Sequence, residues 1–441
     1  MEIDWVDGPN AGFSSDAQGQ LFAGLLEQPG AIATSEGDAG SALAGAARVI
    51  ETTNEFPYLA HAAMEPLNCT VWIKPDGVEI WSPTQFQTID QQVAASVAGV
   101  KPEQVKIHTM LLGGGFGRKA TPTSDFTFEA VHVAKAVGNP VKVIWTREDD
   151  MRGYYYRSRT LVRTRVGLDA AGMPTAWTSD IVNCSIARGT GFEKFMIKNG
   201  VDSTSVEGLS DLSYAVPNLR VTYHEAPKPV PVLWWRSVGN SYTGFVKETV
   251  IDQCAVAAGK DPVDYRIALL AKEPRQQALL RLAAIKAGWG QAPKGHFQGV
   301  AVHASFESIV AQVIEVSVDD DGTPHVHRVV CAVDPGMVIN PEIVRAQLES
   351  AVIFGLSQAL HGKITFKDGR VEQGNFNDYP VVRMNETPPI ETYILESGAQ
   401  MGGIGEPGVP PVAPALANAI AAATGKRIYA LPIDPALLKK A

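Results

Sequence analysis

Cysteine is scarce in this chain of 441 residues, and what little there is lies scattered. No two of the cysteines form a C-x-x-C pair; they are Cys69, Cys184, Cys254 and Cys331. This spacing argues against an iron–sulfur cluster or a structural zinc site within the chain itself. Buried free thiols are the interpretation that remains, because unpaired cysteine is among the most buried residue types.

The chain also lacks long apolar runs and an excess of positive charge. Its longest apolar stretch, residues 413–423, is too short and too interrupted to span a bilayer. The net charge of -9 argues against nucleic acid or acidic membranes as partners. Residues 1–20 have neither a basic start nor an apolar core, so no signal peptide is visible. With 45% hydrophobic residues, the chain can form two or three ordinary domains.

Strand-like and helix-like segments alternate without a repeating β–α–β unit, which predicts an α+β or mixed α/β fold. We expect strands at 70–73, 78–81, 105–112, 141–146, through most of 160–225, and at 310–318 and 325–333. We expect helices at 91–98, from 123 or 124 to 137, at 245–258, after a cap at Asp261, and at 275–287, 341–360 and 411–423. We divide the chain into an N-terminal remnant of an upstream region (1–54), a first lobe (55–226) and a second lobe (227–441).

The most informative stretch is Gly-Gly-Ile-Gly-Glu-Pro-Gly at residues 402–408, which a helix of small residues follows at once. It places Glu406 between glycines, among them Gly403 and Gly405, where the backbone can approach a bulky ligand closely. A carboxylate in such a turn is a candidate for moving a proton. The alternative is that Glu406 caps the following helix, because the helix dipole favours negative charge at its N-terminus.

A second glycine loop, Gly-Gly-Gly-Phe-Gly-Arg-Lys at residues 113–119, connects an expected strand to an expected helix. Its row of backbone N–H groups could bind a phosphate or an oxo group. The loop matches neither the P-loop nor the dinucleotide fingerprint, because Arg118 interrupts both patterns. A tight structural turn is the alternative. If the loop binds a cofactor, the candidate binding residues are Gly114, Gly115, Phe116, Gly117 and Arg118.

Two amides and one aromatic cluster complete the candidates. Gln85 follows an expected strand and Gln347 lies in the helix at 341–360, where a neutral amide can both donate and accept hydrogen bonds. Trp234, Trp235 and Arg236 place a cation beside two large rings. The alternatives are solvent-facing amides and an aromatic anchor of the core or of an interface.

Taken together, these stretches resemble the large, molybdenum-binding subunit of the xanthine oxidase family of molybdenum hydroxylases. The resemblance is nearest to the branch of isoquinoline oxidoreductases and aldehyde dehydrogenases. The matching stretches follow the family's order; they are 57–70, 82–85, 113–119, 234–252, 338–347 and 402–419.

The resemblance implies a role for each matching position. Glu406 matches the catalytic base, and Gln85 matches the glutamine that hydrogen-bonds a molybdenum oxo ligand. Phe116 and Gly117 match the loop that presents backbone N–H groups to the metal, and Gln347 matches a glutamine on the pterin. In this family the pterin dithiolene holds molybdenum, so we expect no side chain of this chain to ligate the metal.

The resemblance also implies the reaction and its participants. We expect oxidation of an aldehyde or an N-heteroaromatic compound with water as the oxygen source. The implied cofactor is molybdopterin cytosine dinucleotide with molybdenum. Electrons pass to [2Fe–2S] clusters of a small iron–sulfur subunit, and a cytochrome c is a further expected partner. The alternative is a non-catalytic cofactor-binding or scaffold half of a multi-subunit molybdoenzyme.

Three departures from the family pattern modify these expectations. Ala120 stands where purine-oxidising members carry a glutamate, which argues against xanthine as the substrate. Trp234 and Trp235 precede Arg236, which matches a substrate-pocket arginine of some members, and predict an aromatic or restricted pocket. Relatives of this branch carry an upstream segment with a Gly-Gln-Gly loop, which this sequence does not contain. We expect either that a separate polypeptide supplies the segment or that this chain is a processed or truncated piece. The resemblance favours the periplasm and the bare N-terminus favours the cytoplasm.

Overall fold

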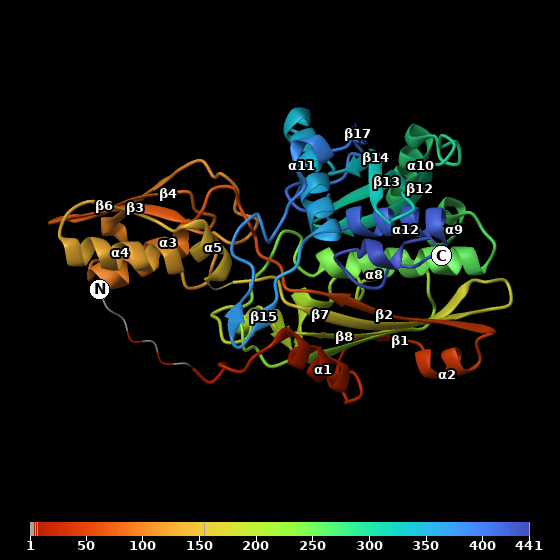
Figure 1. Cartoon of the computed structure of the whole chain (residues 1–441), viewed down its shortest axis with the longest axis horizontal. Helices are drawn as coiled ribbons and strands as arrows, with labels where there is room; N and C mark the ends of the chain where they lie inside the picture. The colour runs from red at the N-terminus through yellow and green to blue at the C-terminus, as the bar shows by residue number, and fades with distance from the viewer. Residues whose placement is uncertain (1–3, 5, 7, 154, 441) are drawn as a thin grey trace.

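The first half of the chain forms a five-stranded mixed sheet. The computed structural model describes residues 4, 6, 8–153 and 155–440. The sheet has the order β1-β11-β8-β7-β2, in which only the β11–β8 pair is parallel. Its strands are β1 (Ala31–Glu36), β2 (Arg48–Phe56), β7 (Thr160–Leu168), β8 (Pro174–Asn183) and β11 (Leu219–Glu225). Helices α1 (Ser15–Leu25) and α2 (Ala39–Ala44) lie beyond it at the bottom of Figure 1.

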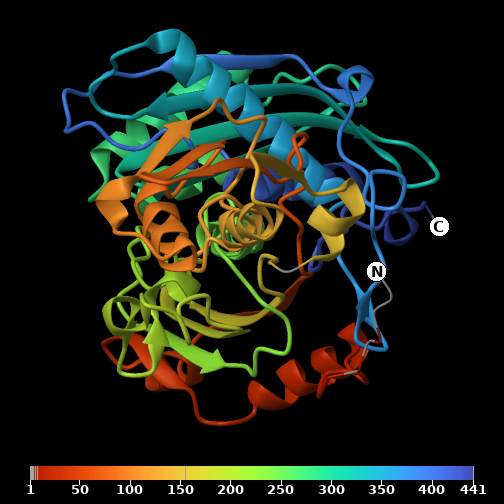
Figure 2. The same ribbon diagram turned by 90° about the vertical axis from the view of Figure 1, so that its left-hand side faces the viewer.

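A small four-stranded body projects from one end of the molecule (Figure 1). Its strand order is β5-β4-β3-β6, and α3 and α4 pack on the sheet around a core that includes Val71, Ile80 and Phe126. Its elements are β3 (Asn68–Lys74), β4 (Gly77–Ser82), α3 (Gln87–Ala98), η1 (Pro102–Gln104), β5 (Val105–Thr109), α4 (Asp125–Val137), β6 (Val141–Ile144) and α5 (Arg147–Arg152). Figure 2 shows this body from its outer end, with the five-stranded sheet below it.

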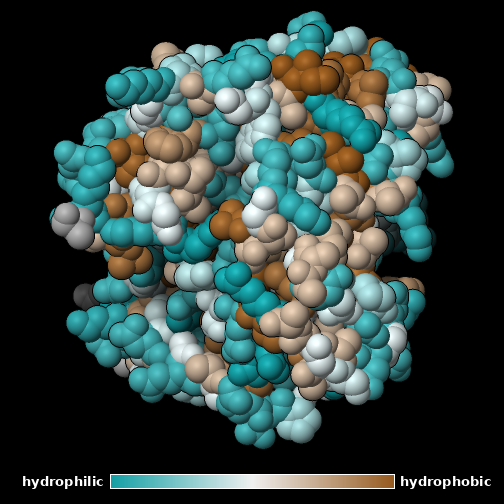
Figure 3. Space-filling view, turned by 90° about the vertical axis from the view of Figure 1, so that its right-hand side faces the viewer, coloured by the Kyte–Doolittle hydropathy of each residue, from teal (hydrophilic) through white to brown (hydrophobic). Residues whose placement is uncertain are grey.

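The second lobe is built on another four-stranded sheet, of order β12-β13-β14-β17. Helix α12 packs between this sheet and α8, while α10 packs against β13 and β14. The elements are α8 (Asn240–Ala257), α9 (Pro262–Leu269), α10 (Pro274–Ala287), β12 (Phe297–Ser305), β13 (Ser308–Val318), β14 (Pro324–Asp334), α11 (Pro341–Leu360), β17 (Ile390–Ile394) and α12 (Val412–Thr424). The end of the molecule opposite the small body mixes hydrophilic and hydrophobic residues (Figure 3).

Short elements connect these bodies. Two small hairpins and several single turns lie between the main strands and helices. They are α6 (Glu193–Met196), β9 (Ile197–Lys198), β10 (Val201–Asp202), α7 (Ser203–Val206), β15 (Phe366–Lys367), β16 (Arg370–Val371), η2 (Met384–Glu386) and η3 (Pro435–Leu437). Within the described residues, no helix is both long and apolar enough to cross a membrane.

The mixed α/β fold expected from the sequence is confirmed, with some differences at element ends. Helix α11 has the expected bounds, because Asn340 accepts hydrogen bonds from two first-turn N–H groups. The strand expected at 105–112 ends at Thr109, and exposed residues lead from it into the glycine loop. The N-terminal residues 31–54 include two strands that pair with strands of the 160–225 region. All four cysteines are buried and free, as expected.

Candidate active site

The two glycine loops, which lie almost 300 residues apart in sequence, meet at one pocket of about 690 Å³. The pocket lies where the small body, the connection between β8 and β11, helix α11 and the turn before α12 come together. Every candidate residue except Arg118 and Gly403 lines it. The lining residues are Gln85, Gly114, Gly115, Phe116, Gly117, Ala120, Ile186, Met196, Thr204, Trp234, Trp235, Arg236, Val238, Gln347, Ser350, Gly405 and Glu406.

Arg118 and Gly403, the two candidates that do not line the pocket, form hydrogen bonds with other parts of the protein. The guanidinium of Arg118 is buried and donates to both carboxylate oxygens of Asp125, with N···O distances of 3.1 and 2.6 Å. Gly403 donates its N–H to the carbonyl of Phe306 at 2.8 Å, and its own carbonyl accepts from the hydroxyl of Ser308 at 2.6 Å. Both residues therefore stabilise a loop without facing the pocket.

The glycine loop of the small body needs its glycines because other groups approach its backbone closely. A Cβ on Gly115 would lie 2.3 Å from Oε1 of Gln85, and a Cβ on Gly117 would lie 2.4 Å from the carbonyl oxygen of Trp234. Gly117 also has a φ of 105°, which side-chain-bearing residues rarely adopt. Oε1 of Gln85 accepts from the N–H groups of Gly117 and Lys119, each at 3.3 Å. The Gln85 NH₂ group is the donor that this arrangement leaves for the pocket.

An aromatic stack joins this loop to α11. Phe116, at a φ of 55°, stacks its ring on Phe354 with 4.3 Å between centroids, and Trp235 stacks on Phe354 at 4.5 Å. The carbonyl of Phe116 accepts from the backbone N–H of Arg236 at 3.0 Å. The loop, α11 and the Trp235–Arg236 segment therefore form one packed wall.

Arg236 is engaged by the protein itself. Its Nε donates to the carbonyl of Gly405 at 2.7 Å, and one terminal nitrogen donates to the hydroxyl of Ser350 at 3.0 Å. The other terminal nitrogen donates to the carbonyl of Gln347 at 3.2 Å and to its Oε1 at 3.0 Å. Burial lowers the pKa of Arg236 to about 10, and the charge of Glu406 opposes that shift. In this arrangement Arg236 ties the Gly405 turn to α11.

Glu406 lies half-buried at the pocket with its carboxylate held on one side. Its Oε1 accepts from the backbone N–H of Ser237 at 3.0 Å, and its carbonyl accepts from the Ser237 hydroxyl at 2.7 Å. Helix α12 begins only at Val412, and its N-cap residue Pro411 makes no side-chain cap hydrogen bond. The helix-capping interpretation of Glu406 therefore does not describe this turn.

Sequence reasoning missed two residues beside Glu406. Ser237 is one, and Glu207 is the other: its carboxylate accepts from the N–H groups of Gly239 at 2.7 Å and Asn240 at 3.4 Å. Burial raises the pKa of Glu207 to about 8, and the charges of Asp211 and Glu406 add to that effect. Glu207 lies outside every matching stretch, and the stretch 234–252 contains Ser237 without singling it out, because both contacts join segments distant in sequence.

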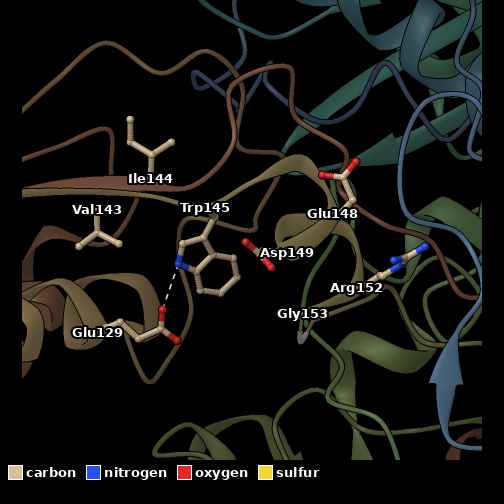
Figure 4. Close-up of a pocket in the computed structure, with 8 residues that line it drawn as sticks. All are labelled: Glu129, Val143, Ile144, Trp145, Glu148, Asp149, Arg152 and Gly153. Atoms are coloured by element: carbon tan, nitrogen blue, oxygen red, sulfur yellow. Dashed lines mark hydrogen bonds between the residues drawn. The ribbon is translucent and has the colours of Figure 1, made fainter. Parts of the chain in front are cut away.

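Two further pockets involve residues of the small body, and one of them adjoins the site. One of about 560 Å³ lies between β6 and α5, and Glu129, Glu148 and Asp149 make it acidic (Figure 4). There Nε1 of Trp145 donates to Oε2 of Glu129 at 3.0 Å. Another of about 720 Å³ shares Phe116 with the site and has a largely apolar lining. Among the described residues, no group of three or more His, Cys, Asp or Glu side chains is placed to hold a metal ion.

Comparison with known proteins identifies a domain family for most of the chain. Residues 25–269 and 266–388 each match a molybdopterin cofactor-binding domain. The chain is 34% identical to the isoquinoline 1-oxidoreductase subunit beta of Brevundimonas diminuta over an alignment of 388 residues. The match covers 85% of this chain and 49% of the relative. It is 32% identical to a membrane-bound aldehyde dehydrogenase (pyrroloquinoline-quinone) of Gluconacetobacter polyoxogenes over an alignment of 405 residues. That match covers 85% of this chain and 52% of the relative.

The fold also matches solved structures. Quinoline 2-oxidoreductase from Pseudomonas putida 86 superposes with a TM-score of 0.78, covering 92% of this chain and 78% of that one at 14% identity. The chain spans about half the length of the two curated relatives. It belongs to the molybdopterin cofactor-binding domain family, and within that family to the large-subunit type of the xanthine oxidase family.

Proposed function

We propose that this chain is the catalytic part of a molybdenum hydroxylase that oxidises an aldehyde or an N-heteroaromatic compound with water as the oxygen source. The observation that carries the proposal is the meeting of Glu406, the 113–117 loop and Gln85 at one pocket. The names of the relatives support it, because they include an isoquinoline oxidoreductase and an aldehyde dehydrogenase.

The pocket residues fit a large polar cofactor. The Gly114–Gly117 backbone forms a cradle without bulky side chains except Phe116, whose ring is turned onto Phe354. The loop N–H groups that are not bonded within the protein, the Gln85 NH₂ group and the Gln347 NH₂ group would hold the molybdopterin. When bound, the cofactor supplies the redox centre, while the protein supplies orientation, hydrogen bonds and a base.

Glu406 is the base in this proposal. Its carboxylate lies at the pocket with Oε1 held by the Ser237 N–H, so that Oε2 can accept the proton released as water's oxygen is transferred. Arg236 fixes the preceding carbonyl of Gly405 and so limits movement of the turn. Ile186, Met196 and Trp234 add an apolar wall, which suits a flat or aliphatic neutral substrate.

The finer assignments belong to the same proposal. We infer molybdopterin cytosine dinucleotide as the cofactor form, and [2Fe–2S] clusters in a small iron–sulfur subunit as electron acceptors. A polypeptide region carrying the Gly-Gln-Gly loop would complete the cofactor site, and a cytochrome c would accept electrons further on. The resemblance of the sequence to this family supports each of these assignments.

Glu406→Gln in the full-length holoenzyme tests the function. The amide keeps the size of the side chain and cannot accept the proton, so we expect turnover to fall by about 10²–10⁴ while molybdenum content stays at the wild-type level. Steady-state kinetics and metal analysis of the same preparation measure both. The matched control is Glu103→Gln in the exposed turn η1, which should retain wild-type turnover.

Two results would count against the proposal. Turnover near the wild-type level in a fully loaded Glu406→Gln enzyme would remove Glu406 as the base. Wild-type enzyme that holds molybdenum in its complete assembly, yet oxidises neither aldehydes nor azaarenes, would favour the non-catalytic scaffold alternative.

A further inference from the structure

The chain between Trp235 and α8 passes through an unusual backbone turn. Ser237 has a φ of 77° and Val238 has a φ of 47°, so two consecutive residues with side chains are left-handed. Such a conformation is uncommon for any non-glycine residue and a genuine outlier for a β-branched one. Backbone strain of this kind persists only where the surroundings enforce it, and it concentrates at functional sites.

The contacts of Ser237 show what this turn achieves. Its side chain is fully buried, and both of its hydrogen-bond donors go to Glu406. The N–H reaches Oε1 of the carboxylate at 3.0 Å, and the hydroxyl reaches the carbonyl oxygen at 2.7 Å. One residue thus fixes both the side chain and the backbone of Glu406. The preceding residue, Arg236, fixes the carbonyl of Gly405 at 2.7 Å.

The identity of the residue is informative because glycine would satisfy the backbone better. A φ of 77° costs glycine little, whereas serine adopts it with strain. Serine offers the hydroxyl that glycine lacks, and that hydroxyl donates to the backbone carbonyl of Glu406 itself. A buried hydroxyl with a partner stabilises only the geometry in which the partner stays in place.

We propose that Ser237 is a positioning residue that holds the carboxylate of Glu406 at the pocket through its N–H and its hydroxyl. The inference rests on the proposed function, in which Glu406 is the base. Two ionisable side chains also interact with the charge of Glu406, Arg236 favourably and Glu207 unfavourably.

Hydrogen–deuterium exchange of the full-length protein tests the hold on Glu406 without reference to activity. The variants are Ser237→Ala and Ser237→Gly, which both delete the hydroxyl. Ser241→Ala is the matched control, because the Ser241 hydroxyl is also buried and donates to a carbonyl, that of Val238, at 2.7 Å. Prolines at 407, 410 and 411 carry no amide hydrogen, so the signal from 402–411 reports on 402–406, 408 and 409.

We expect both Ser237 variants to exchange these amides at least about tenfold faster than wild type, and Ser241→Ala to leave them unchanged. Equal protection of 402–411 in wild type and Ser237→Ala would overturn the inference. Equal acceleration in Ser241→Ala would overturn it as well, because a general loosening of the segment would then explain the effect.

Kinetics of the holoenzyme provide the second readout. We expect kcat to fall at least about tenfold in both Ser237 variants, with KM within about twofold of wild type, because the base and not the substrate is displaced. Wild-type rates in Ser237→Gly would contradict the hydroxyl's role. Failure of the proposed function would show in Glu406→Gln, and the exchange measurement would still decide on Ser237.

Discussion

Glu207 shows how a single buried side chain bears on both stability and the site. Its carboxylate lies at the start of α8, and burial raises its pKa to about 8. In the unfolded chain this carboxyl has its ordinary pKa of about 4.5. Between these two values the native protein binds more protons than the unfolded chain. Stability contributed by this group is therefore present at low pH and is lost as the pH rises through that window.

Glu207→Gln should remove this pH-dependent penalty. The amide oxygen can still accept from the Gly239 N–H, but the side chain no longer has to ionise in a buried site. We expect the variant to gain about 1–3 kcal/mol more stability over wild type at pH 8 than at pH 5.5. Thermal unfolding of both proteins at the two pH values measures this difference. A gain of the same size at both pH values would show that ionisation of Glu207 is not its cause.

The residue scale also shows where sequence reasoning stops. The glycine loops could be predicted because glycine clusters carry a local conformational meaning. Glu406 was a candidate because of its place in such a loop, and Gln85 was a candidate because of its place after a strand and the resemblance to the family. Ser237 and Glu207 could not, since their roles come from contacts with segments brought close only by folding. Arg236 was expected in the substrate pocket; it lines the pocket, but its hydrogen bonds go to the carbonyl of Gly405 and to side-chain and backbone groups of α11.

At the scale of elements, close contact between backbones fixes how α12 sits on its sheet. Gly299 of β12 faces α12 so closely that a Cβ would lie 2.2 Å from both the carbonyl oxygen of Ala415 and the nitrogen of Ala419. Backbone atoms cannot move aside as a flexible side chain can. The turn that carries Glu406 leads directly into this helix, so the contact also places the proposed base.

Gly299→Ala should therefore destabilise the protein. We expect a loss of about 1–3 kcal/mol, as for overpacked cores, or failure to fold. Gly24→Ala is the control, since Gly24 lies in α1 with no atom within 4 Å of an added Cβ, and alanine favours helix. That variant should gain up to about 1 kcal/mol. Chemical unfolding measures both; a Gly299→Ala protein as stable as wild type would contradict the packing described for α12.

Element boundaries followed the sequence where caps are local and departed from it where burial is complete. Asn340 and Pro341 mark the start of α11 as expected. Helix α8 begins five residues before the expected position, at Asn240 rather than at 245. Nearly every side chain from Asn240 to Ala255 is buried, including charged Lys247 and Glu248, so no apolar stripe reveals where the helix starts.

On the scale of the whole molecule, the site exists only where separate bodies meet. The small body contributes Gln85 and the 114–117 loop, the connection between β8 and β11 contributes Ile186 and Thr204, and α11 and the turn before α12 contribute Gln347 and Glu406. The chain spans about half the length of the two curated relatives, so the complete proteins have further residues with which to enclose a cofactor. Binding and turnover are therefore best measured on the natively purified protein.

The central claim is that this chain carries the molybdenum cofactor, and metal analysis of the natively purified assembly tests it most directly. We expect about one molybdenum per copy of this chain, because one cofactor pocket serves one redox centre. Iron should appear only in proportion to a companion subunit, since the cysteines of this chain are buried and far apart. An intact assembly with no molybdenum would contradict the account.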